Sequence, residues 1–224
     1  MKLVLYSGGF ADENYQMDIN LISLVKTKEV SLTFIPSCHY HSNEDYEDIV
    51  KQYKALGVKK FLKFDIDQNF SSVLKKTALG ADIIYLGGGN TFYFLKKLKE
   101  SGMLDELKSW ATAGGILSGM SAGAIILTKK IETASFPSFD RDDNDDNLKN
   151  LSAMDLVNFE FFPHYKNSKR YDDELILYSK KNSRPLYACV DGGGIVITNE
   201  ETRFIGNTAC FINGTKYFIN KLMK

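Results

Sequence analysis

Short apolar runs alternate with longer amphipathic segments along the first half of the chain. Apolar runs at residues 3–6, 32–35, 61–65, 83–86 and 115–119 predict buried strands, because strands covered on both faces carry nearly continuous apolar residues. Helical periodicity occurs at residues 12–28, 43–56, 70–79, 91–100 and 104–113. This alternation predicts an α/β fold with a mostly parallel sheet and helices on both faces.

The pattern changes after residue 150. A strand at 159–162 and a helix at 168–181 precede crowded short strands at 186–190, 195–198, 203–206, 209–212 and 216–219. Asn213-Gly214 separates the last two and is a strong signal for a type I′ hairpin. The C-terminal quarter therefore predicts antiparallel strands packed on the edge of the parallel sheet. Since the sequence has no linker or repeat, residues 1–224 are predicted to form one domain.

Charge and cysteine content narrow the class of protein. Lys plus Arg number 28, and Asp plus Glu also number 28, so the formal net charge is zero. The chain therefore lacks the positive charge that would favour binding to a nucleic acid or an anionic membrane. The three cysteines are widely spaced and form no C-x-x-C pair, which argues against a disulfide framework or a structural zinc site. No segment has the length and apolarity of a membrane span. We expect a cytoplasmic protein.

The segment Gly119-Met120-Ser121-Ala122-Gly123 places one serine between two glycines and between two apolar runs. This G-x-S-x-G spacing is typical of a nucleophile elbow, where a strand ends, reverses sharply and enters a helix. The glycines let strand and helix approach closely, and the serine is then presented at the apex in a strained conformation. The amide of Ala122 would open the helix, where a free N–H group favours negative charge.

Three further features each follow a predicted strand: the run Gly87-Gly88-Gly89-Asn90-Thr91, then His164, and then Asp191. In an open parallel sheet, ligands bind beyond the carboxyl ends of the strands. Each feature taken singly is ordinary turn or loop chemistry. Their joint placement at one edge is harder to explain as turns, and it predicts an active site.

Ser121, His164 and Asp191 supply an alcohol, a base and a carboxylate. Histidine can accept the serine proton near neutral pH, and a carboxylate behind the imidazole fixes its tautomer. This order differs from that of α/β-hydrolases, where the acid precedes the histidine. An acid between serine and histidine would come from residues 140–146 or from Asp155, and none of these clearly follows a strand. Asp191 is therefore the predicted acid.

A tetrahedral oxyanion needs two or more hydrogen-bond donors. The backbone amides of Gly88, Gly89 and Ala122 are the predicted donors. Asn90 and Thr91, which follow the glycines, are candidate substrate-binding residues.

An aspartate-rich segment at residues 138–147 stands apart from the rest of the chain. Its alternating acids suggest a calcium loop, but an EF-hand requires glycine at the sixth position and glutamate at the twelfth. Those positions hold Asp145 and Leu151. We interpret the segment as a solvated acidic loop near the active edge and not as a metal site.

Three motifs together resemble peptidase family S51, the aspartyl dipeptidases: residues 87–92 (GGGNTF), residues 119–124 (GMSAGA) and Phe162-Pro163-His164. The resemblance extends over essentially the whole chain. It implies a flavodoxin-like fold similar to class I glutamine amidotransferases, with serine where those enzymes use cysteine. The family's nucleophile falls on Ser121, its base on His164, its acid on Asp191 and its oxyanion loop on Gly88 and Gly89. It also implies hydrolysis of dipeptides that begin with aspartate.

The sequence departs from the aspartyl dipeptidases at two places. Those enzymes carry glutamate at the position of Asp191, and they carry an aspartate soon after the elbow helix, where residues 133–137 here contain no acid. An acidic substrate needs a cationic partner, ideally an arginine that binds a carboxylate with two hydrogen bonds. Arg170, Lys166 and Lys169, which follow His164, are the candidates.

Two other classes of function remain open at this stage. His39 and His41 follow a strand, and with His164 they would give three imidazoles, enough for a catalytic zinc of a metal-dependent hydrolase. Alternatively, residues 87–91 could bind a small anion at a helix N-terminus without catalysis. We predict instead a serine peptidase that acts on small peptides without a cofactor, as a monomer or weak homodimer.

Overall fold

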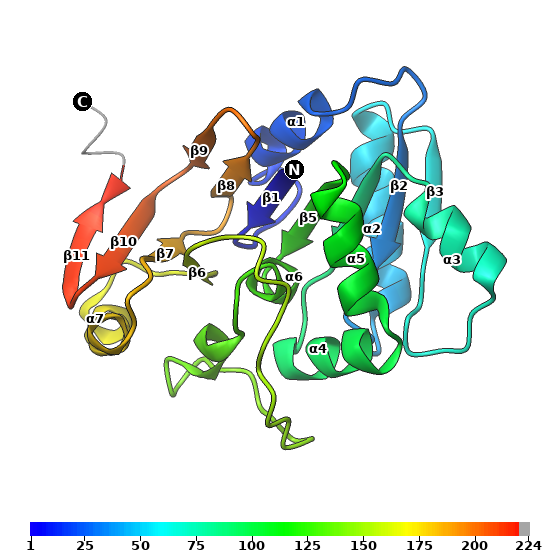
Figure 1. Cartoon of the computed structure of the whole chain (residues 1–224). Helices are drawn as coiled ribbons and strands as arrows, with labels where there is room; N and C mark the ends of the chain where they lie inside the picture. The colour runs from blue at the N-terminus through cyan, green and yellow to red at the C-terminus, as the bar shows by residue number, and fades with distance from the viewer. Residues whose placement is uncertain (220–224) are drawn as a thin grey trace.

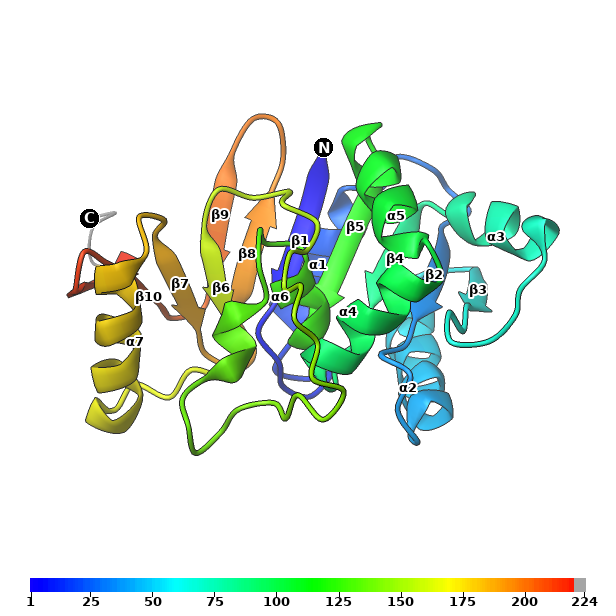
Figure 2. The ribbon, with the colours of Figure 1, turned by 60° about the horizontal axis from the view of Figure 1, so that its bottom comes forward.

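The computed structural model describes residues 1–219 and contains two sheets that lie side by side (Figures 1 and 2). The larger sheet has seven strands in the order β3-β2-β4-β5-β1-β8-β9, and the smaller has four in the order β11-β10-β7-β6. The predicted fold class, a mostly parallel sheet flanked by helices with antiparallel strands near the C-terminus, is confirmed.

Five strands of the large sheet are parallel: β1 (Lys2–Tyr6), β2 (Ser31–Ile35), β3 (Lys60–Lys63), β4 (Ile83–Leu86) and β5 (Ile116–Met120). Two antiparallel strands, β8 (Gly194–Ile197) and β9 (Thr202–Ile205), continue the sheet beyond β1. Tyr6 pairs with Met120, so the carboxyl ends of β1 and β5 lie next to each other. The elbow serine therefore emerges beside the end of β1.

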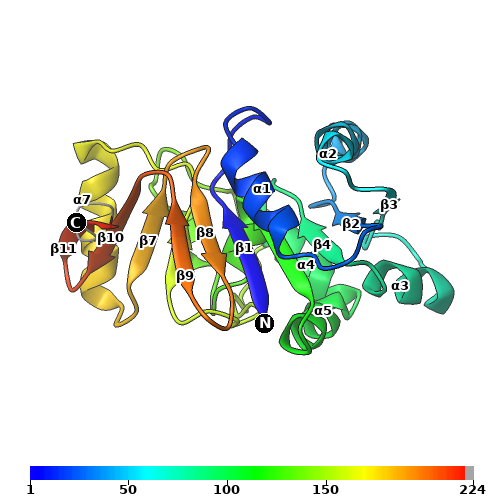
Figure 3. The ribbon, with the colours of Figure 1, turned by 90° about the horizontal axis from the view of Figure 1, so that it is seen from above.

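Helices cover both faces of the large sheet (Figure 3). One face is covered by α1 (Tyr15–Ser23) and α2 (Ser42–Ala55), and the other by α3 (Ser72–Leu79), α4 (Thr91–Glu100), α5 (Met103–Thr112) and the short α6 (Ala122–Ile126). Each face has its own apolar core: Met17, Leu21 and Tyr53 pack on the first, and Phe94, Leu98 and Leu107 on the second. Burial on both faces explains why these strands read as continuous apolar runs.

The small sheet contains β6 (Glu160–Phe162), β7 (Leu186–Cys189), β10 (Thr208–Ile212) and β11 (Thr215–Phe218). Helix α7 (Lys169–Lys181) places Tyr171 and Leu175 in a third apolar cluster with Leu186 and Phe211 of this sheet. Strands β10 and β11 are antiparallel and are joined by Asn213 and Gly214, both with positive φ. The predicted hairpin is confirmed, because a type I′ turn needs positive φ at both central residues.

Two details differ from the sequence prediction. We expected the late strands to pack on the edge of the parallel sheet, but only β8 and β9 do so, and the other four form a separate sheet. Period-two patterns show which residues face a core but do not specify the partner strand. The helix predicted at residues 12–28 spans only Tyr15–Ser23, because the chain first turns at residues 11–14, where the Asn14 amide donates to Phe10 O.

Strand β5 and helix α6 cross at very short range around the elbow. A Cβ atom on Gly119 would overlap the backbone of Gly123, and one on Gly123 would overlap the carbonyl of Leu86. Neither neighbour is a flexible side-chain end, so the packing here requires glycine. The elbow thus depends on backbone contacts between β4, β5 and α6.

Replacing Gly123 with alanine should destabilise the protein by about 1–3 kcal/mol, because the added methyl group must displace the Leu86 backbone. Urea unfolding followed by circular dichroism measures this loss. Gly88→Ala is the matched control for stability, since Gly88 does not have positive φ and its added Cβ would lie at an ordinary contact distance of 3.6 Å from the nearest atom. An equal or larger loss in the control would show that collision at the elbow is not the cause.

Candidate active site

Ser121 lies at the sharp turn between β5 and α6. Its backbone has φ 50° and ψ −110°, a conformation that non-glycine residues rarely adopt. The Ser121 amide donates a 3.0 Å hydrogen bond to Tyr6 O at the end of β1, which holds the turn against the sheet. The strained geometry expected of an elbow serine is therefore present and is fixed by a backbone contact.

The side chains of Ser121, His164 and Asp191 form one hydrogen-bonded row, here called the serine array. His164 Nε2 lies 2.8 Å from Ser121 Oγ, and His164 Nδ1 lies 2.8 Å from Asp191 Oδ1. An ionised carboxylate can only accept, so Nδ1 donates to Asp191 and Nε2 is left to accept the serine proton. The structure thus brings together the three side chains that the sequence singled out.

The small sheet positions the imidazole and the carboxylate. His164 follows β6 and Asp191 follows β7, and these two strands are parallel, so their carboxyl ends are adjacent. Beyond His164, the Tyr165 amide donates to Cys189 O at 2.9 Å. His164 itself has φ 54°, which turns its side chain back toward Ser121. One sheet therefore presents the serine and the other presents its two partners.

Two residues at the end of β1 complete the site and were missed by the sequence analysis. The buried Ser7 hydroxyl donates to Cys189 O at 2.8 Å and accepts from the His164 amide at 2.7 Å. A Cβ atom on Gly8 would overlap the His164 ring and would lie 2.6 Å from Asp191 Oδ1. The only signal in the sequence was Ser7-Gly8-Gly9 directly after the first strand, which resembles an ordinary turn.

The residues of the predicted oxyanion donors lie near Ser121: Ala122 follows it in the chain, and Gly89 lines the same pocket. The amides of Gly88, Gly89 and Ala122 make no hydrogen bond within residues 1–219. Gly88 is so close that a Cβ atom on it would lie 3.6 Å from Ser121 Cβ. These free N–H groups are available to an oxygen bound beside Ser121.

The hydrogen bond from His164 lowers the pKa of Asp191 below the ordinary value of 3.8, while partial burial opposes this shift. The nearby Ser7 hydroxyl and Lys166 lower it further. Asp191 is therefore a carboxylate at neutral pH, the form that orients the imidazole.

Ser121 and His164 open into a cavity of about 380 Å³, here called the site pocket. Thr91, Thr133, Arg141 and Asp142 also line it. The Arg141 guanidinium makes no ion pair or hydrogen bond within residues 1–219, and it is a further cation that the sequence analysis missed. Arg170 instead stacks on the Phe139 ring, 3.3 Å from its centroid, and does not line the site pocket.

The acidic loop is docked on the start of α4. Asp142 accepts a 2.8 Å hydrogen bond from the Thr91 amide, and the Asn90 side chain donates to Asp143 O at 2.8 Å. Asn90 also caps α4, since its Oδ1 accepts from the Tyr93 amide at 2.9 Å. The Asn90 side chain therefore serves the fold, whereas Thr91 lies in the site pocket.

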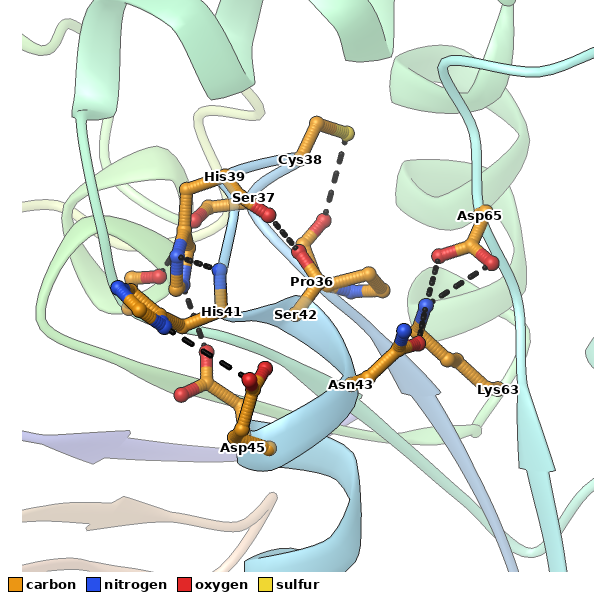
Figure 4. Close-up of polar contacts among 12 residues, drawn as sticks. Pro36, Ser37, Cys38, His39, His41, Ser42, Asn43, Asp45, Lys63 and Asp65 are labelled. Carbon is orange, nitrogen blue, oxygen red and sulfur yellow. Dashed lines mark hydrogen bonds and ion pairs between the residues drawn. The ribbon is translucent and has the colours of Figure 1, made fainter.

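His39 and His41 do not join His164. His39 Nε2 lies 2.7 Å from Asp45 Oδ2 (Figure 4). His41 Nδ1 lies 3.9 Å from Glu44 Oε1. Within residues 1–219, no group of three or more His, Cys, Asp or Glu side chains is arranged to hold a metal ion. The zinc arrangement that would combine His39, His41 and His164 is therefore wrong.

Within residues 1–219, no helix has the length and apolarity needed to cross a bilayer.

In this site an elbow serine is hydrogen-bonded to an imidazole, and the imidazole is hydrogen-bonded to a carboxylate. This arrangement beside a mostly parallel sheet is typical of serine hydrolases. Residues 3–205 match the model of Peptidase family S51. The chain belongs to this family and is a peptidase.

Similar proteins carry related names. An uncharacterized peptidase of Pasteurella multocida is 27% identical over 209 residues, which cover 92% of this chain and 97% of that protein. Peptidase E of Actinobacillus pleuropneumoniae is 28% identical over 58% of each chain. The crystal structure of a "Putative Peptidase E Protein" from Listeria monocytogenes has a TM-score of 0.71 and 26% identity, covering 91% of this chain and 96% of that one.

Replacing His164 with alanine should raise the pKa of Asp191 toward its ordinary value, because the largest lowering contribution is removed. Because the pKa of Asp191 is lower in the folded protein than in the unfolded chain, its ionised carboxylate increases the free energy of unfolding above about pH 4. This contribution is lost as the pH falls through the lowered pKa. A ¹³C NMR titration of the aspartate carboxyls measures the change. Ser121→Ala is the control, since Ser121 does not contact Asp191. Equal pKa values of Asp191 in the native protein and both variants would show that the hydrogen bond from His164 is not what lowers this pKa.

Proposed function

We propose that the chain is a serine peptidase that hydrolyses small peptides through Ser121, His164 and Asp191. One observation carries the proposal: Ser121 Oγ, the His164 ring and the Asp191 carboxylate are joined by two 2.8 Å hydrogen bonds in sequence. Membership of family S51 supports the same reading.

The proposed reaction begins when Ser121 Oγ attacks the peptide carbonyl carbon and its proton moves to His164 Nε2. The amides of Gly88, Gly89 and Ala122 hold the resulting oxyanion. The C–N bond then breaks, and His164 returns the proton to the leaving amine. Water, deprotonated by the same imidazole, then attacks the ester carbon; the bond from this carbon to Ser121 Oγ breaks, the acid leaves, and His164 returns the proton to Ser121 Oγ. Asp191 keeps the imidazole oriented throughout and stabilises its cation.

The finer proposal concerns dipeptides with an N-terminal aspartate. An acidic side chain in the site pocket needs a cation, and Arg141 lines this pocket with an unpaired guanidinium among the described residues. Arginine can bind a carboxylate with two parallel hydrogen bonds. The acids Asp140 and Asp142 also line the pocket, but they are engaged by the Tyr171 hydroxyl and the Thr91 amide. Arg141 is therefore the residue on which this preference depends.

A fluorophosphonate probe should label Ser121 of the native protein, because the imidazole activates its hydroxyl. Intact-protein mass spectrometry should detect no label on Ser121→Ala and at least a hundredfold slower labelling of His164→Ala. Ser118→Ala is the matched control, since Ser118 is a buried serine of β5 whose hydroxyl donates to Val4 O and not to the imidazole. Equal labelling of the native protein and His164→Ala would exclude the assigned base.

Replacing Arg141 with glutamine should raise KM for aspartyl dipeptides about tenfold or more, because a charge-assisted contact is lost. Alanyl dipeptides should change little, and Arg170→Gln should leave both substrates unaffected because Arg170 stacks outside the site pocket. A dipeptide hydrolysis screen with Ser121→Ala as the blank provides these constants. If Arg170→Gln raises KM for aspartyl dipeptides more than Arg141→Gln does, Arg170 and not Arg141 binds the aspartate side chain.

A further inference from the structure

A second, larger cavity meets the site pocket at Gly89, which lines both. Its volume is about 870 Å³, compared with about 380 Å³ for the site pocket. Cavities that bind small molecules usually measure roughly 300–1,000 Å³. Gly87 and Gly88 also line the larger cavity, so it reaches the turn where the amides of Gly88 and Gly89 have no partner within residues 1–219.

The walls of this cavity are mainly apolar. Phe34, Ile49 and Tyr85 are buried side chains on its floor, and Met120 lines it directly before Ser121 in the chain. Phe10 lies on its rim with 81% of its surface exposed. A large exposed aromatic side chain beside an apolar cavity gains burial when an apolar group enters.

Tyr85 carries an unpaired polar atom in this cavity. Its hydroxyl has no hydrogen-bond partner within residues 1–219, although the residue is only 1% exposed. The neighbouring hydroxyls of Tyr6 and Tyr53 both contact the buried Asp18, at 3.0 and 2.8 Å. Because Tyr85 lines the cavity, its hydroxyl is available to donate a hydrogen bond to a polar atom of a molecule bound there.

The rim is predominantly acidic. Three carboxylates, Asp12, Asp45 and Asp48, line the cavity, and Asp45 is paired with His39. Lys51, also on the rim, makes no ion pair within residues 1–219 and is available for a terminal carboxylate. This charge distribution disfavours a ligand with an acidic side chain.

We propose that the large cavity binds an aromatic or large aliphatic side chain of the substrate residue on the amine side of the cleaved bond. This inference rests on the proposed peptidase function. The N-terminal residue then occupies the site pocket beside Arg141, and the carbonyl between the two residues lies at the amides of Gly88 and Gly89. The substrate class is a dipeptide whose second residue is large and apolar.

The test compares dipeptides with one fixed first residue, in an aspartyl and an alanyl series, and with phenylalanine, leucine, glycine or glutamate second. We expect kcat/KM for phenylalanine and leucine to exceed that for glycine by about ten- to a hundredfold, and glutamate to be no better than glycine. Equal values for phenylalanine and glycine, or a preference for glutamate, would overturn the proposal.

Phe10→Ala should reduce the ratio of phenylalanine to glycine several-fold and should fold normally, since Phe10 is exposed. Tyr217→Ala is the matched control, because Tyr217 is an exposed aromatic residue on β11 and lines neither cavity. A ratio that is the same in Phe10→Ala and the native protein would overturn the assignment of the cavity.

Binding to Ser121→Ala, measured by calorimetry, separates this inference from the proposed function. If the phenylalanine dipeptide binds more tightly than the glycine dipeptide but the native protein hydrolyses neither, the cavity is still a binding site for the apolar side chain and the proposed peptidase function is rejected. If the native protein hydrolyses dipeptides without preference for the second residue, the proposed peptidase function stands and the proposed role of the cavity is rejected.

Discussion

The hydroxyl of Ser7 connects the end of β1 to both strands of the small sheet that carry the partners of Ser121. It donates to the carbonyl of Cys189 on β7 and accepts from the amide of His164 after β6. On its other side, β1 fixes the elbow, because Tyr6 O accepts from the Ser121 amide. The position of the imidazole relative to the serine is therefore set by one strand end, and the absence of a side chain on Gly8 leaves room for it.

Much of the fold and the central row of the site could be predicted because both depend on local signals. Strand ends locate Ser121, His164 and Asp191, and glycine spacing identifies the elbow. The division into two sheets could not be predicted, since the apolar pattern of β6 or β7 is satisfied by either partner sheet. Arg141 was missed because its place in the site pocket depends on how residues far apart in the sequence dock.

The acidic loop affects the site through a contact that uses one helix N-terminus. Asp142 accepts from the Thr91 amide, so a carboxylate of the chain itself occupies the start of α4. This contact argues against the hypothesis that residues 87–91 bind a small anion without catalysis, because the Thr91 N–H group already donates to Asp142. The amides of Gly88 and Gly89 remain available next to Ser121. The last residue of this short turn therefore docks the acidic loop, while the amides of Gly88 and Gly89 keep no partner within residues 1–219.

The serine array is divided between two sheets, so its geometry depends on how the sheets dock as well as on the local structure of each. Ser121 follows β5 of the large sheet, whereas His164 and Asp191 follow β6 and β7 of the small sheet. A shift of one sheet against the other would change the distance from Ser121 Oγ to His164 Nε2 and would leave the hydrogen bond between His164 and Asp191 intact. The docking of the sheets therefore controls one of the two hydrogen bonds, and the small sheet alone holds the other.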